Sequence, residues 1–151
     1  MRSRAVLLSV SHTLVRWGKP SRTSLIAWQI TSKYPDSITD HFKFKSFYFG
    51  CVVTNVATVA SVPSTCSVTA NGFRNGQQVA TQTFKFQPPK ALLGLPALST
   101  NMTHAVLASQ FGNVDKVTFA ADGFTSSTLE AVLLDNFAYD VYLKKGGSFS
   151  Y

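Results

Sequence analysis

The chain lacks most of the features that would identify a specialised class of protein. Among its 151 residues there are only two cysteines and three histidines, and 14% of the residues are charged. Two cysteines are too few for a small domain held together by several disulfides. No run of about 18 apolar residues occurs, so the sequence predicts no membrane-spanning helix. The remaining profile is that of one ordinary globular domain, long enough to bury a hydrophobic core without a structural metal.

Acidic residues are absent from the first 35 positions, and the N-terminal third carries most of the net charge. Residues 1–46 hold eight basic and two acidic side chains, whereas the rest of the chain holds six basic and five acidic ones. The net charge of +7 therefore does not describe a basic folded surface. Because nucleic-acid binding needs basic groups gathered on a folded face, the sequence disfavours a nucleic-acid partner.

Residues 1–41 are predicted to be a basic leader or a flexible arm. Their Arg, Ser and Thr content without acidic residues is typical of a mitochondrial transit peptide. The basic start followed by residues 5–10 is the alternative pattern of a secretory signal, but its six-residue run is shorter than the usual 7–15 or so. A third interpretation is a segment that replaces the natural leader. The sequence leaves these three alternatives open.

From Phe42 onward the hydrophobic residues alternate with small or charged ones, a period typical of a strand with one buried face. The Asn75-Gly76 pair suits the positive φ angles of a tight hairpin turn, and Pro88-Pro89 ends the strand after it. Further strands are predicted within residues 66–70, 78–86, 114–119 and 129–143, with a loop or one helical turn at 91–101. The pattern predicts a single all-β, antiparallel β-sandwich over residues 42–143, followed by a tail at 144–151.

Cys51 and Cys66 are separated by a stretch that could close a loop between two paired strands. A disulfide there would stabilise the fold by about 3 kcal/mol in an oxidising compartment. Two buried free thiols and a pair of metal ligands are the alternatives. Zinc is disfavoured because a site needs four ligands at close spacing, and the histidines are isolated at His12, His41 and His104.

Asn101 begins an Asn-Met-Thr triplet, which is an acceptor sequence for N-glycosylation. Such triplets also occur by chance in proteins that never meet the glycosylation machinery. Together with the predicted disulfide, the triplet favours a secreted, extracellular protein, with a mitochondrial location as the alternative.

Four segments of the chain resemble small secreted proteins of filamentous fungi, which are galactose-binding-like β-sandwiches of the jelly-roll type. These segments are residues 47–53, 62–69, 79–84 and 133–139, and the resemblance covers about residues 42–143. The block containing both cysteines and the final Leu-Asp-Asn strand are its most specific parts. The resemblance implies architecture and export, and it transfers no ligand-binding residue to this chain.

Few residues are suited to catalysis. Between Phe42 and Leu143 there is one histidine, His104. No Gly-x-Ser-x-Gly motif, Walker loop or dinucleotide fingerprint occurs. A small enzyme or accessory protein that acts on a metabolite in a sandwich pocket, with His104 or Asp135 in turnover, is the alternative function. A calcium ion is considered at Asp135 and Asn136, since calcium takes carboxylate and carbonyl oxygens.

The predicted function is a secreted, non-catalytic binding protein. Its ligand is a glycan or cell-wall polymer, or in a variant of the same hypothesis a host protein bound by a secreted effector. Sugar-binding sites combine aromatic rings with amide or guanidinium groups. The densest group of these lies at the predicted hairpin tip and consists of Asn71, Phe73, Arg74, Asn75 and Gln77. The alternative for this group is a solvated turn, and the oligomeric state is left open.

Overall fold

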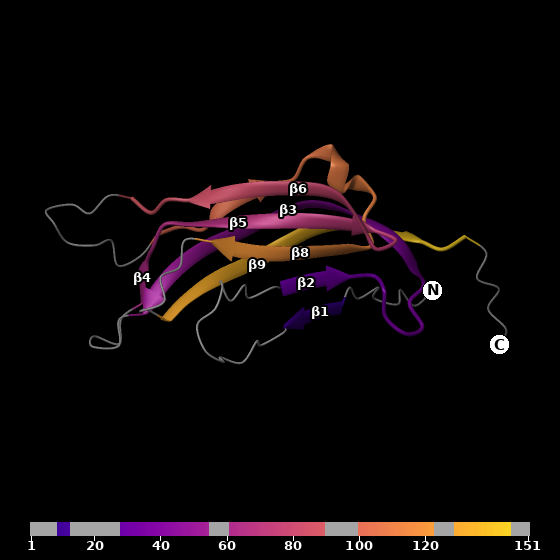
Figure 1. The fold of residues 1–151 in the computed structure, drawn as a ribbon, viewed down its shortest axis with the longest axis horizontal. Helices are drawn as coiled ribbons and strands as arrows, with labels where there is room; N and C mark the ends of the chain where they lie inside the picture. The colour runs from indigo at the N-terminus through magenta and orange to yellow at the C-terminus, as the bar shows by residue number, and fades with distance from the viewer. Residues whose placement is uncertain (1–8, 13–27, 55–60, 90–99, 123–128, 146–151) are drawn as a thin grey trace, which may run out of the picture.

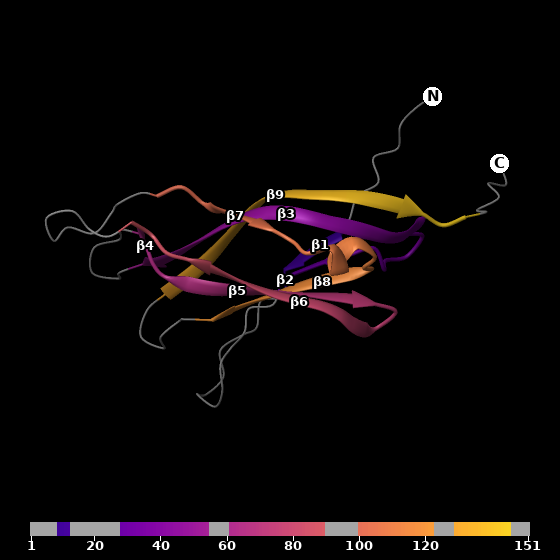
Figure 2. The same cartoon turned by 90° about the horizontal axis from the view of Figure 1, so that it is seen from above.

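The computed structural model describes residues 9–12, 28–54, 61–89, 100–122 and 129–145. These residues form two antiparallel β-sheets that lie one over the other, so the predicted all-β sandwich is confirmed (Figure 2). Sheet A has the spatial order β1 (Ser9–His12), β2 (Trp28–Thr31), β8 (Lys116–Asp122), β5 (Cys66–Arg74) and β6 (Gln77–Phe86), which Figure 1 shows from bottom to top. Sheet B contains β3 (Thr39–Thr54), β4 (Ser61–Pro63), β7 (Thr103–Val106) and β9 (Leu129–Leu143). The short 3-10 helix η1 (Ser109–Gly112) lies between β7 and β8.

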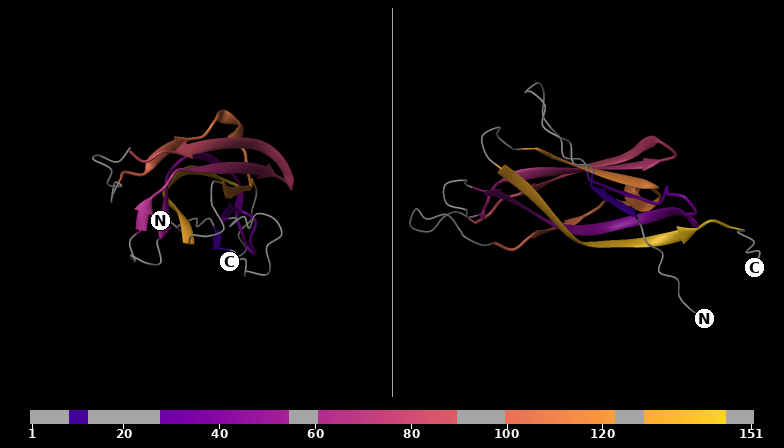
Figure 3. Two further views of the ribbon diagram at one scale, coloured as in Figure 1. Left: turned by 60° about the vertical axis from the view of Figure 1, so that its left-hand side comes forward. Right: turned by 90° about the horizontal axis from the view of Figure 1, so that it is seen from below.

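Strand β3 is the centre of sheet B. It pairs with β9 from Thr39 to Thr54, and the two long strands twist together along their length (Figure 3). Because β9 occupies one edge of β3 throughout, β7 and β4 share the other edge. The side chains of one face of β3 point to sheet A, and those of the other face form the outer surface of sheet B.

In the described part of the chain, phenylalanine rings fill the space between the two sheets. Phe42 and Phe44 are buried in β3, and the register with β9 then shifts around Ser46, so the alternation restarts at Phe47. The ring of Phe47 meets that of Phe119 in sheet A edge to face, with centroids 5.3 Å apart. Among the described residues, six phenylalanines are less than 2% exposed: Phe42, Phe44, Phe47, Phe49, Phe111 and Phe119.

The predicted hairpin joins β5 to β6. Asn75 and Gly76 have φ angles of 51° and 82°, the left-handed values that this tight turn requires. β6 ends at Phe86, shortly before the two prolines, as the sequence predicts. The last strand has the predicted bounds 129–143. The loop expected at 91–101 lies outside the described residues except for its last two positions.

The sheets begin before the predicted boundary at Phe42. β2 pairs with β8 in sheet A, β1 pairs with β2, and the first three residues of β3 also precede Phe42. Trp28 and Ile30 of β2 contribute to the core, with Ile30 only 2% exposed. The range 1–41, predicted as a leader or arm, therefore includes strand residues, because β2 pairs with the edge of β8 that β5 leaves free.

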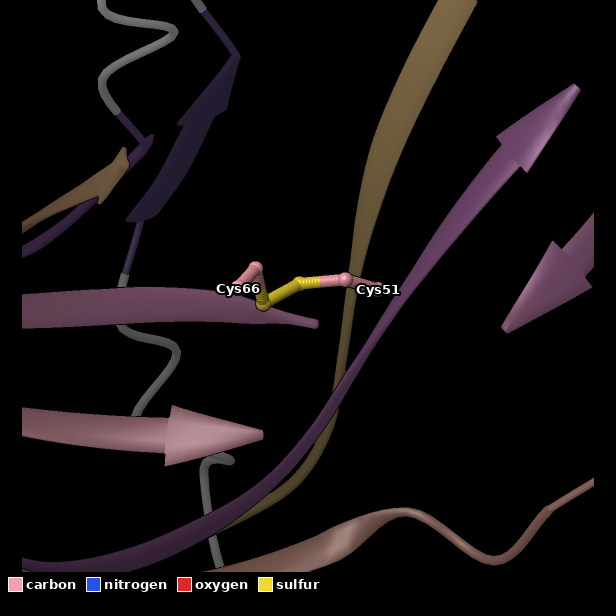
Figure 4. The surroundings of a disulfide bond; sticks show 2 residues. All are labelled: Cys51 and Cys66. Carbon is pink, nitrogen blue, oxygen red and sulfur yellow. A yellow bond between two sulfur atoms is a disulfide. The ribbon is translucent and has the colours of Figure 1, made fainter. Parts of the chain in front are cut away.

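The predicted disulfide between Cys51 and Cys66 is present, with the two Cα atoms 6.2 Å apart (Figure 4). Cys51 lies on β3 in sheet B and Cys66 on β5 in sheet A, and both are buried. The expectation that the bond joins two paired strands was wrong, since among the described strands β5 pairs with β6 and β8. The disulfide instead links the two layers of the sandwich.

Candidate functional site

The five residues predicted at the hairpin tip face in different directions. Asn71 and Phe73 point outward from sheet A, because Ala70 and Gly72 beside them are buried. The Asn71 side-chain oxygen accepts a hydrogen bond of 2.8 Å from Thr81. The ring of Phe73 lies 4.6 Å from the Lys116 ammonium, a cation–π contact.

The remaining three residues of this group are Arg74 at the end of β5, Asn75 in the turn and Gln77 at the start of β6. Arg74 points toward β3, the backbone N–H of Asn75 donates to the buried Asp115 carboxylate at 2.7 Å, and Gln77 is exposed. The hairpin tip is thus held largely by contacts within the chain. A ligand site at the tip stays a prediction.

Asp40, at the start of β3, connects the two sheets near this turn. Arg74 donates to the backbone oxygen of Asp40 at 2.8 Å and to its carboxylate oxygens at 3.0 and 3.2 Å. The imidazole Nδ1 of His41 lies 2.7 Å from the same carboxylate. The hydrogen bonds from His41 and then Arg74 lower the pKa of Asp40 below its ordinary value of 3.8.

The outer face of sheet B has an exposed aromatic centre. Tyr48 on β3 is 37% exposed, and His104 on β7 stacks on its ring with centroids 4.6 Å apart and planes 20° from parallel. In the strand register Tyr48 lies directly opposite His104 on one side and Asp135 of β9 on the other. These three side chains form one row across sheet B.

Two exposed aliphatic side chains complete this surface, which we name the Tyr48 patch. Val106, two positions after His104, is 60% exposed, and Leu133, two positions before Asp135, is 49% exposed. Residues two apart on a strand share a face. The Tyr48 patch therefore consists of Tyr48, His104, Val106, Leu133 and Asp135.

The arrangement of the Tyr48 patch does not suit acid–base catalysis. His104 and Asp135 lie on strands either side of β3, so their backbones are about 10 Å apart at the usual strand spacing. A catalytic base and its orienting acid need hydrogen-bond contact. The Asp135 carboxylate instead accepts a 2.7 Å bond from the N–H of Asn136, whose φ of 51° marks a local irregularity in β9.

Among the described residues, no three His, Cys, Asp or Glu side chains come close enough to hold a metal ion. The calcium site considered at Asp135 and Asn136 gains no support from this part of the chain. No helix in the same part of the chain has the length and apolar character to cross a membrane.

Asn101, the predicted glycosylation site, is exposed and lies just before β7. Thr103 of the same triplet is exposed and pairs with Phe49 at the end of the β3–β7 ladder. The Asn101 side chain is thus accessible for a glycan, and it lies three positions before His104.

The Tyr48 patch as a unit cannot be predicted from the sequence alone. The alternation of buried Phe47 and Phe49 already places Tyr48 outward, which is a signal that a single strand can provide. Its neighbours could not be identified in this way, because His104 and Asp135 are more than 50 residues away and the pairing register brings them to Tyr48.

The fold and this surface define an antiparallel β-sandwich with a disulfide between its sheets and an exposed tyrosine–histidine pair on one outer face. Comparisons with family models, curated proteins and solved structures found no match for this chain.

Proposed function

We propose that this chain is a secreted, non-catalytic carbohydrate-binding protein, and that the Tyr48 patch contacts the sugar. The single observation that carries the proposal is the exposed Tyr48 ring, held in place by His104 and opposite Asp135. An aromatic ring stacks on the apolar face of a pyranose, while imidazole and carboxylate groups bond its hydroxyls. The disulfide supports the extracellular part of the proposal, because such bonds persist in oxidising compartments.

The rigidity of the patch favours binding over turnover. Its members are on three paired strands of one sheet, so little conformational freedom is lost when a ligand binds. The space between the sheets is occupied by phenylalanine rings in the described part of the chain, which leaves the outer surfaces as the places for a ligand.

The experiment is a glycan-array screen of the full chain, followed by calorimetric titration of each positive sugar with wild type and Tyr48→Ala. We expect Tyr48→Ala to weaken binding by about two- to tenfold, the loss of one aromatic stacking contact. Tyr48→Phe, which keeps the ring, should retain most of the affinity. Val79→Ala is the matched control, since Val79 is 46% exposed on β6 of the other sheet.

Two results would redirect the proposal. If Phe73→Ala or Arg74→Ala abolishes binding while Tyr48→Ala does not, the sugar binds at the hairpin tip and the Tyr48 patch is not the site. If no glycan binds and a metabolite is turned over in a manner that depends on His104 or Asp135, the carbohydrate-binding function itself is wrong.

A further inference from the structure

A second exposed tyrosine–histidine pair lies on the same face as the Tyr48 patch. Tyr142 on β9 stacks on His41 of β3, with centroids 4.5 Å apart and planes 7° from parallel. The two residues are directly opposite in the strand register, and Tyr142 is 45% exposed. Phe42 next to His41 is fully buried, so this pair is on the outer face of sheet B.

The two pairs are separated along one continuous strand. His41 and Tyr48 are seven positions apart on β3, which corresponds to about 23 Å in an extended strand. An even-numbered and an odd-numbered residue share the outer face here because the alternation shifts by one position around Ser46. The aromatic pairs therefore lie apart on one outer surface, one near the start of β3 and the other near its middle.

The surface between the two pairs is polar and has little net charge. Lys45 of β3 forms an ion pair of 2.6 Å with Asp140 of β9, and both side chains are nearly half exposed. Lys43, also exposed, is opposite Asp140 in the register, and Asp135 lies at the other end of this stretch. Because the two lysines are balanced by two carboxylates, the surface complements a neutral polymer rich in hydroxyls better than a polyanion.

We infer that the outer face of sheet B binds a neutral, linear polysaccharide chain that runs along β3 and contacts both Tyr48 and Tyr142. This inference rests on the proposed carbohydrate-binding function and names its ligand class. A disaccharide is too short to reach both rings, whereas a longer chain stacks on each ring and places its hydroxyls beside Lys45 and Asp140. Affinity must then increase with chain length, and Tyr142 must contribute only to the binding of long chains.

The test is calorimetric titration of the full chain with disaccharides and hexasaccharides of β-1,3-glucan, β-1,4-glucan, chitin and mannan. For at least one polymer the hexasaccharide should bind at least tenfold more tightly than the disaccharide. Tyr142→Ala should weaken hexasaccharide binding by about two- to tenfold and leave disaccharide binding unchanged. Tyr142→Phe should restore hexasaccharide affinity, and thermal unfolding of each variant verifies that the fold is intact.

The outcomes separate the two proposals. If Tyr48→Ala weakens binding of both lengths while Tyr142→Ala weakens neither, the extended site is wrong and the carbohydrate-binding function stands. Preference for an anionic polymer over every neutral one on the glycan array would also overturn the extended neutral site. If wild type binds none of the sugars, both proposals fail.

Discussion

At the residue scale, Asp115 is the carboxylate on which the hairpin turn depends. Its side chain is only 4% exposed and accepts the N–H of Asn75 at 2.7 Å, and Lys33 lies 3.6 Å away. Its backbone oxygen accepts from the N–H of Ser32, which follows β2. One residue thus connects β2, the start of β8 and the β5–β6 turn.

We expect Asp115→Ala to reduce the free energy of unfolding by about 1–3 kcal/mol, because it leaves the Asn75 N–H without its acceptor. Urea denaturation at neutral pH measures the change. Asp115→Asn is the control, since its amide oxygen can still accept the bond, and it should lose less. Equal losses for both variants would show that the negative charge near Lys33 matters more than the hydrogen bond.

At the scale of the elements, the start of β3 and the end of β5 are joined across the sheets by Arg74 and Asp40. Their bonds also orient His41, whose ring stacks on Tyr142 of the inferred extended site. The Asp140–Lys45 pair joins β9 to β3 instead and is an exposed ion pair within one sheet, which contributes little to stability. Asp140 therefore serves as the control for Asp40 when the contribution of each ion pair to stability is measured.

The lowered pKa of Asp40 predicts a pH dependence. A carboxyl whose pKa is lowered in the folded state stabilises that state above its unfolded pKa, and the stabilisation is lost as pH falls through the folded value. Asp40→Asn should therefore lower the melting temperature at pH 6, and its difference from wild type should shrink as pH falls below 3.8. Asp140→Asn should change the melting temperature little at either pH. A difference for Asp40→Asn that stays constant down to pH 2 would contradict this account.

The hairpin and the final strand were predictable because their signals are local. An Asn-Gly pair suits left-handed φ angles wherever it occurs, and residues 129–143 form one long, mostly apolar run. The contribution of Trp28–Thr31 to sheet A was not predictable from such signals. Four residues are too short a pattern, and their strand pairing depends on β8, which lies more than 80 residues later.

At the scale of the whole molecule, the Cys51–Cys66 disulfide ties sheet A to sheet B. The core between the sheets consists of interlocking aromatic rings, which bury large apolar areas but form no bond between the layers. The disulfide limits separation of the two sheets near the C-terminal end of β3 and the N-terminal end of β5, where the two cysteines lie (Figure 4).

We expect the Cys51→Ser/Cys66→Ser double variant to lose about 3 kcal/mol of unfolding free energy, through the greater entropy of the unfolded chain. Chemical denaturation of the variant and of unreduced wild type measures the difference. Intact mass spectrometry before and after reduction and alkylation verifies that wild type from its native source contains the bond. Free thiols in that material would contradict the extracellular part of the proposed function.

The sequence by itself determined the all-β class, the turn at Asn75-Gly76 and the cysteine pair, because each depends on near neighbours or on composition. The tertiary structure decided where the sheets begin, that the disulfide joins two layers, and which side chains meet on the outer face of sheet B. Tyr48 with His104 and His41 with Tyr142 come together through strand register, and register depends on the packing of the whole sandwich. For that reason the candidate site could be recognised only after the strands had been placed beside one another.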